Sequence, residues 1–364
     1  MTTLEKKTKT HNKKRIKNKI NVGEKIDTLN KLVLHHSFYK TVVEINKLKI
    51  QLPIHPTYEE LDFQLYAFPL DGDLVTKVEE MKNYKLNKKK GESLAQNNAI
   101  FVAYDESVNK FSALEGTAFL TSHSLVIHYN KEYIPTNFLT FYFYTRSKTY
   151  TSHSKYIKYS LDPEVDSKRD YVTDRTKFII DNAPKNSIMF IDGPLIGGQI
   201  SDYTINLNNE LLKKNIVPVF FVKNSNSNLI TENIKGLVDK FNSDMHWAYN
   251  ILKPGERTNF FKYVDKQNPN NAKIFCYLKS FDKSPQRIEF HISTYQKYQD
   301  IISDIINLIY YLLLVQGDLN NPQIRSIAIA EKYARDTIRL MDLTKIMKKS
   351  GIIPTMNQER FAWG

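Results

Sequence analysis

The chain has 364 residues, of which 41% are hydrophobic, and its 52 Lys and Arg against 39 Asp and Glu give a formal net charge of +13. That length can bury a sizeable core, and the positive charge favours a polyanionic partner, either nucleic acid or an anionic membrane surface. The single cysteine, Cys276, excludes an intrachain disulfide and a cysteine-based zinc cage. One cysteine fits a reducing, cytosolic setting, and no apolar run is long enough to cross a bilayer, so we expect a soluble, cytoplasmic protein with no membrane partner.

The first 94 residues are predicted to form a tail and a helical extension. Residues 1–20 are basic with little to bury, so they are predicted to be a disordered tail that is either only solvated or contacts phosphates. Apolar residues recur near helical spacing over 24–51, which predicts an amphipathic helix, and a second helix is predicted over 74–84. We therefore expect residues 21–94 to be a helical extension of the main domain.

Residues 95–364 are predicted to form one α/β domain. Its first half contains apolar runs rich in aromatic and β-branched residues, and their short connections are typical of antiparallel neighbours. These strands are predicted at 99–104, 110–114, 118–129 and 138–146. Helices and strands then alternate, as in a parallel crossover unit. The alternating elements are helix 170–183, strand 188–191, helix 201–215 and strand 217–222.

Two further strands and two long helices complete the domain. The strands are predicted at 273–279 and 287–292, and the helices at 295–315 and 323–347. A sheet whose first half is antiparallel and whose second half is parallel, with helices on its faces, has the layout of an RNase H-like fold. We therefore expect a mixed α/β fold of that class, with the two long helices at its C-terminus.

Two of the apolar strands lead directly into a carboxylate. AIFVAY is followed by Asp105, and SIMFI is followed by Asp192, Gly193 and Pro194. Carboxylates brought to one cleft by neighbouring strands repel each other unless a cation lies between them, and such hard oxygen ligands select Mg²⁺ or Mn²⁺. The alternative is that each aspartate only makes a turn, since Asp-Gly is a common turn pair. Two such acids in a basic protein leave both interpretations open.

Several blocks of sequence, in order, resemble the motifs of the NurA nucleases. FVAYDESVNK is similar to the first acidic motif of that family and MFIDGPL to the second, and in each an apolar strand ends in an aspartate. VPVFFVKNSNSNLI resembles the strand that follows, and ILKPGERTNFF resembles a Pro-Gly-Glu-Arg-Thr block beyond it. With the late strands IFCYLKS and PQRIEFHIS and the last helix, the resemblance covers residues 95 to 350, approximately.

The resemblance implies an RNase H-like, Mn²⁺-dependent deoxyribonuclease, with Mg²⁺ as the alternative ion, that resects DNA ends in double-strand break repair. It implies 5′–3′ exonuclease and single-strand endonuclease activities, a homodimer, and a hexameric HerA-type ATPase as partner. Asp105 and Asp192 would be the core metal ligands. A carboxylate on the helix before the second aspartate is also implied. Asp174 is the first choice for it, with Glu164 and Asp181 behind.

The chain also departs from the family pattern. Where the family has Tyr-Pro and then Ala-His, this chain has Asn321-Pro322 and Ala330-Glu331, and Glu106 follows the first aspartate in place of a glycine. Glu331 could bind a metal through a hard oxygen, but it cannot supply an imidazole. The missing Tyr and His favour an alternative function, a catalytically weak or inactive dimeric adaptor that binds DNA and the ATPase.

Two basic residues are candidates for DNA contacts. Lys223 follows the strand predicted over 217–222, and Arg257 belongs to the Pro-Gly-Glu-Arg-Thr block. Each is placed to meet a phosphate, and the simpler interpretation of each is a solvated loop residue.

Overall fold

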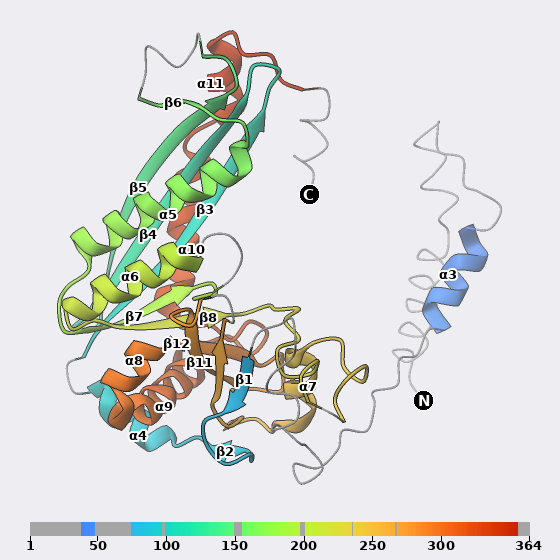
Figure 1. Ribbon diagram of the computed structural model, residues 1–364, viewed down its shortest axis with the longest axis vertical. Coiled ribbons are helices and arrows are strands. Elements are labelled where there is room, and N and C mark those ends of the chain that lie inside the picture. The colour runs from blue at the N-terminus through green and yellow to red at the C-terminus, as the bar shows by residue number, and fades with distance from the viewer. Residues whose placement is uncertain are drawn as a thin grey trace, which may run out of the picture. The chain divides into compact units, whose positions relative to one another are not determined.

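The computed structural model describes residues 38–47, 74–96, 99–148, 155–196, 201–234, 236–265 and 268–355 (Figure 1). The chain divides into two compact units, Met1–Pro53 and Ile54–Gly364. In the first unit the described residues form helix α3 (Phe38–Lys47), which falls inside the helix predicted over 24–51. The predicted tail, residues 1–20, and the rest of that predicted helix lie outside the described residues.

The second unit is built on one mixed sheet. Its described strands are β1 (Leu74–Lys77), β2 (Tyr84–Lys85), β3 (Ile100–Ser112), β4 (Thr117–Tyr129), β5 (Glu132–Thr145), β6 (Ile157–Tyr159), β7 (Ser187–Asp192), β8 (Val217–Val222), β9 (Glu256–Arg257), β10 (Phe261–Val264), β11 (Ala272–Lys279) and β12 (Gln286–His291). The order across the sheet is β1-β10-β11-β12-β8-β7-β3-β4-β5-β6, and β9 pairs with β11 and β2. β8 is buried along its whole length, which explains its continuous apolar sequence.

Five neighbouring strands have the RNase H-like arrangement that the sequence predicts. β3, β4 and β5 are antiparallel neighbours, and β7 and β8 then run parallel to β3. Beyond β8, strands β12, β11 and β10 extend the sheet with antiparallel pairings. The predicted fold class, a mixed α/β sheet flanked by helices, is confirmed.

Helices cover both faces of this sheet. They are α4 (Lys88–Gln96), α5 (Pro163–Asn182), α6 (Ser201–Lys213), α7 (Asp244–Ile251), α8 (Ile292–Lys297), α9 (Gln299–Gln316), α10 (Arg325–Arg339) and α11 (Leu343–Lys349). In Figure 1, α5 and α6 lie in front of the strands and α10 lies behind them. Tyr104 of β3 packs with α5 and α6, and Ala103 packs with α9 and α10. Because side chains alternate along a strand, Asp105 faces the α10 side with Ala103.

Residues 74–84 do not form the predicted helix. β1 and β2 pair with β10 and β9, so this segment belongs to the sheet, and Val75 of β1 is fully buried. The extended conformation of this segment is set by pairing with strands that are distant in the sequence. The local spacing of apolar residues does not indicate such pairing.

Three predicted helices have different bounds in the structure. α5 begins at Pro163 rather than 170, because Asp162 caps it by accepting a hydrogen bond from Val165 N. The helix predicted over 295–315 is two helices, α8 and α9, which meet at Tyr298. The helix predicted over 323–347 is also two, α10 and α11, and Asp342 caps the second. Among the helices of the described residues, none has both the length and the apolarity needed to cross a bilayer.

Candidate metal centre

Two aspartates lie side by side where β3 and β7 separate. The parallel register pairs Tyr104 with Ile191, so the next residues, Asp105 and Asp192, follow at the same level. β7 ends at Asp192, and the chain then turns at Gly193, whose φ of +108° is a conformation that favours glycine. The neighbouring strands thus deliver both carboxylates to one place.

Asp105 does not end its strand, in contrast to the prediction. β3 continues to Ser112, because β4 pairs with it along its whole length. Only the pairing with β7 ends beside Asp105. The Asp105 carboxylate is therefore held by a continuous strand, and only Asp192 has a turn directly after it.

α10 brings a third carboxylate to the same place. Ile327 and Ala330 of this helix are buried in its packing, and Glu331 lies beside them, partly exposed. One oxygen from each of Asp105, Asp192 and Glu331 lies within 4.8 Å of the other two. These three acids, which we call the acid triad, offer the hard oxygen ligands that Mg²⁺ and Mn²⁺ prefer.

The ammonium group of Lys223 lies between two members of the acid triad. Its Nζ is 2.6 Å from Asp192 Oδ2 and 3.3 Å from Glu331 Oε2. Burial lowers the pKa of Lys223, but Asp192 and Glu331 outweigh this effect, and its pKa is raised overall. The lysine therefore stays charged, and its positive charge offsets the carboxylates of the triad. The three carboxylates together fit a bound cation.

Asp105 is the buried member of the triad, with 8% of its surface exposed. The pKa of Asp105 is raised to about 8, first by burial and then by the neighbouring Asp192 and Glu106 carboxylates. The backbone N–H of Glu106 donates to Asp105 Oδ1 at 2.8 Å. A divalent cation bound to this carboxylate would favour its ionised form and reverse the shift.

Two residues that no motif marks surround Glu331. Gln323 Nε2 donates to Glu331 Oε2 at 3.1 Å, and Arg335 pairs with Oε1. Burial alone would raise the pKa of Glu331, but Gln323, Lys223 and Arg335 outweigh it and lower the pKa. The i,i+4 spacing of Glu331 and Arg335 is a sequence signal for that pair. Gln323 has no such signal, because it lies in the segment before α10.

The other predicted carboxylates lie away from the triad. Asp174 is in the middle of α5, on the opposite face of the sheet from Asp105, and it accepts a hydrogen bond from Tyr142 Oη at 2.8 Å. Glu164, also on α5, pairs with Lys110. Asp181 is exposed near the end of the same helix. The structure therefore brings Asp105, Asp192 and Glu331 together and leaves these three acids on the α5 side.

Arg257, predicted to contact DNA, is buried in an ion pair. Its guanidinium pairs with Glu79 and donates to Thr258 O at 2.8 Å. It also stacks on two rings, with Cζ 4.4 Å from the centroid of Tyr84 and 4.3 Å from that of Phe260. Only 6% of the side chain is exposed, so it does not face a phosphate. Of the two predicted contacts, only Lys223 lies at the triad.

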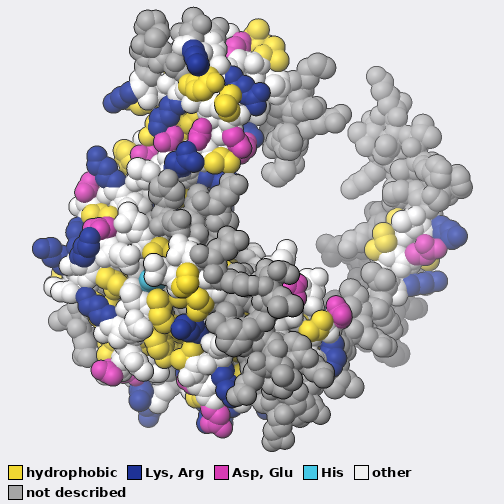
Figure 2. Space-filling model, in the orientation of Figure 1, with side chains coloured by type: hydrophobic (Ala, Val, Ile, Leu, Met, Phe, Trp, Pro, Cys, Tyr) yellow, Lys and Arg dark blue, Asp and Glu magenta, His cyan; other side chains and the backbone are white. Residues whose placement is uncertain are grey.

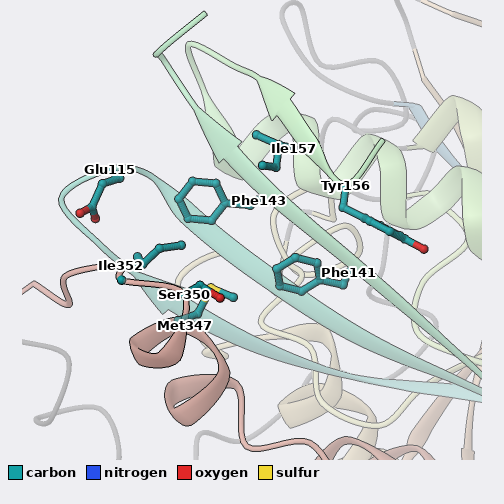
Figure 3. A pocket seen from close by; sticks show the side chains of 9 residues that line it. Glu115, Phe141, Phe143, Tyr156, Ile157, Met347, Ser350 and Ile352 are labelled. Atoms are coloured by element: carbon teal, nitrogen blue, oxygen red, sulfur yellow. The ribbon is translucent and has the colours of Figure 1, made fainter. Parts of the chain in front are cut away.

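A mostly apolar pocket lies at the far end of the antiparallel strands. It encloses about 430 Å³, and Phe141, Phe143, Ile157 and Met347 are among the side chains around it (Figure 3). None of the candidate site residues lines it. Figure 2 shows Lys and Arg side chains spread over the visible face of this unit rather than gathered in one patch. The candidate site is thus defined here by the acid triad.

Comparison with known proteins identifies a family. The model of the NurA domain matches residues 137–336, more than half of the chain. This range includes Asp192, Lys223 and Glu331, and it begins after Asp105. The sequence matches none of the curated proteins. The family match supports a nuclease role for the chain.

Solved structures with a similar chain include nucleases. The NurA nuclease from Sulfolobus solfataricus is 11% identical with a TM-score of 0.45, over 74% of this chain and 88% of that chain. Endonuclease V from Ciona intestinalis, in complex with an inosine-containing DNA, is 10% identical with a TM-score of 0.30, over 69% and 94%. A NurA bound to dAMP and manganese is 7% identical with a TM-score of 0.28, over 65% and 84%. At such TM-scores these likenesses add no weight to the family match.

Proposed function

Because this chain belongs to the NurA family, we propose that it is a metal-dependent DNA nuclease whose site is the acid triad. The observation that carries the proposal is that three carboxylates, from two strands and a helix, converge within 4.8 Å around a lysine ammonium. Carboxylates held this close together need a cation to offset their repulsion. The net charge of +13 also suits a polyanionic substrate.

The proposed chemistry assigns a task to each residue of the site. Oxygens of Asp105, Asp192 and Glu331 would hold a divalent ion, which supplies an activated water and offsets charge in the phosphodiester transition state. Lys223, whose ammonium already lies at these oxygens, would bind a phosphate of the DNA backbone. Arg335 and Gln323 keep the Glu331 carboxylate ionised and oriented.

The family resemblance supports a more detailed proposal. The ion would be Mn²⁺, with Mg²⁺ as the alternative, because carboxylate oxygens suit both. The substrate would be DNA ends resected in double-strand break repair, through 5′–3′ exonuclease and single-strand endonuclease activities. The proposed assembly is a cytoplasmic homodimer that works with a HerA-type hexameric ATPase. The nuclease domain would begin near residue 95, after the extension predicted over 21–94.

Incubation of linear DNA with Mn²⁺, Mg²⁺ or EDTA tests this proposal. Cleavage is expected with a divalent ion and should be lost in EDTA. Asp192→Asn should lower the rate by about 10³-fold, since several kcal/mol of transition-state stabilisation depend on the metal. Asp336→Asn changes a half-exposed acid of the same helix as Glu331, and it should cut DNA at the wild-type rate. Cleavage that survives both EDTA and Asp192→Asn would refute the proposal.

The residue at position 331 favours a second function, the catalytically weak or inactive adaptor. Glu331 stands where the family has a histidine, and Lys223, Gln323 and Arg335 already engage its carboxylate. An adaptor would bind DNA with the salt dependence of phosphate contacts, yet it would not cleave DNA with any divalent ion. A DNA-binding titration at several salt concentrations, beside the cleavage assay, distinguishes the two functions.

A further inference from the structure

Three charged residues are buried together on β11 and β12. Lys273 is 3% exposed, Arg287 4% and Glu289 0%. Lys273 Nζ lies 2.8 Å, and Arg287 Nε 2.7 Å, from the same oxygen, Glu289 Oε1. Taking such charges out of water is costly, and apolar side chains of similar volume often stabilise a core equally well. Packing alone therefore does not account for this group, which we call the ion cluster.

The other oxygen of Glu289 holds the turn that follows Asp192. Glu289 Oε2 accepts a hydrogen bond from the backbone N–H of Leu195 at 2.9 Å, and Leu195 is fully buried. Within the same turn, Gly193 N–H donates to Phe221 O of β8 at 2.7 Å. The turn is thus fixed at two points, and this restricts the position of the aspartate that precedes it.

Arg287 holds the loop that follows Lys223. Its Nη1 donates to Ser225 Oγ at 3.0 Å. Lys223 comes directly after β8 and before this anchored serine. Glu289 and Arg287 are themselves an ion pair, so one buried pair contacts both loops that carry charged residues of the candidate metal centre.

We propose that the ion cluster is a positioning unit for the metal centre, which sets Asp192 and Lys223 relative to each other through the turns that follow them. The inference rests on the proposed nuclease function. Directional hydrogen bonds from a charged group fix a loop in one position, which apolar contacts do not. Although burial raises the pKa of Glu289, Lys273 and Arg287 outweigh it and lower the pKa, so the carboxylate remains an acceptor.

The first test exchanges part of the ion cluster for apolar side chains. Lys273→Met/Glu289→Met removes an anion and a cation together, and with them the acceptor for Leu195 N–H, while Arg287 keeps its hydrogen bond to Ser225 and its attraction to Asp244. In a titration of the folded protein, Mn²⁺ affinity should fall about 10–100-fold, as for residues that orient metal ligands. Lys273→Met/Glu289→Gln returns an oxygen that can accept from Leu195, so it should recover part of the affinity.

The second test changes the other contact and leaves the ion cluster intact. Ser225→Ala removes the acceptor for Arg287 Nη1 and for Ser227 N–H, which loosens the loop after Lys223 but not the turn after Asp192. The KM for linear DNA should rise while Mn²⁺ affinity stays at the wild-type value. Asn226→Ala, an exposed change in the same loop, is the matched control and should leave KM unchanged.

The outcomes separate this inference from the proposed function. Wild-type Mn²⁺ affinity in folded Lys273→Met/Glu289→Met would overturn the positioning role, because a purely structural role predicts a changed melting temperature and unchanged affinity. An unchanged KM in Ser225→Ala would also overturn it, and this test stands if the double variant does not fold. Failure of the wild-type protein to bind Mn²⁺ would instead refute the proposed function itself.

Discussion

The two faces of the antiparallel strands hold their acids in contrasting ways. On the α10 face the three carboxylates of the acid triad converge, with Lys223 as a shared counter-ion. On the α5 face, two acids each have a donor of their own: Tyr142 donates to Asp174 at 2.8 Å, and Tyr144 donates to Asp170 at 2.6 Å. Acids with separate donors are spread apart, whereas the oxygens of acids that face each other can bind one ion together. The convergence of the acids, more than their number, marks the candidate metal centre.

The largest expected effect on metal affinity separates Glu331 from Asp174 as the third proposed ligand. Loss of a residue that only orients a ligand costs about 10–100-fold in metal affinity. Glu331→Gln changes a proposed direct ligand, so it should weaken Mn²⁺ binding by about 100-fold. Asp174→Asn should leave Mn²⁺ affinity unchanged. Calorimetric titration measures both. The opposite result, with binding lost only in Asp174→Asn, would move the site to the α5 face and break the comparison.

A smaller effect is expected in how the folding stability depends on pH when no metal is bound. In EDTA the raised pKa of Asp105, about 8, should keep a proton on this carboxyl in the folded protein, whereas the unfolded chain should release it near pH 3.8. The folded state therefore binds more protons between these values, and this group lowers the free energy of unfolding as pH rises from 3.8 towards 8. Asp105→Asn should remove that part of the pH dependence. Melting temperatures measured in EDTA from acid to mildly alkaline pH test it, and identical pH profiles for the two proteins would contradict the prediction.

The smallest effect is expected for a change in a hydrogen bond on the α5 face. Tyr142→Phe removes the hydrogen bond to Asp174 and should lower the free energy of unfolding by about 1 kcal/mol, because the pair is only partly buried. Mn²⁺ affinity should not change. Denaturant unfolding and metal titration of the same variant separate the two quantities, and a fall in Mn²⁺ affinity would show that the two faces are coupled.

The sequence predicts the pairing of Asp105 with Asp192 well, for a physical reason. Both follow apolar runs, and parallel strands joined by a crossover end at the same edge of a sheet. It does not predict that Asp105 lies within a longer strand, because the antiparallel partner β4 extends β3 beyond the point where β7 stops. The same limit applies to β1, whose partner β10 is remote in the sequence.

The identity of the third carboxylate could not be predicted from local sequence patterns. Asp174 and Glu331 both lie on helices, and no local pattern states which face of the sheet a helix covers. The buried residues of α5 and of α10 pack on opposite faces, which separates Asp174 from the two aspartates and brings Glu331 to them. The burial of Arg257 follows from a partner, Glu79, in a segment for which the sequence predicts a helix.

The ammonium of Lys223 also affects how activity and folding should depend on the metal ion. Because a resident side chain already offsets Asp192 and Glu331, loss of the proposed metal would not leave those two carboxylates uncompensated. Chelation should therefore stop the chemistry while the chain remains folded, and added ion should restore activity without refolding. The supply of divalent ions would then act as a reversible switch on an enzyme that is already assembled.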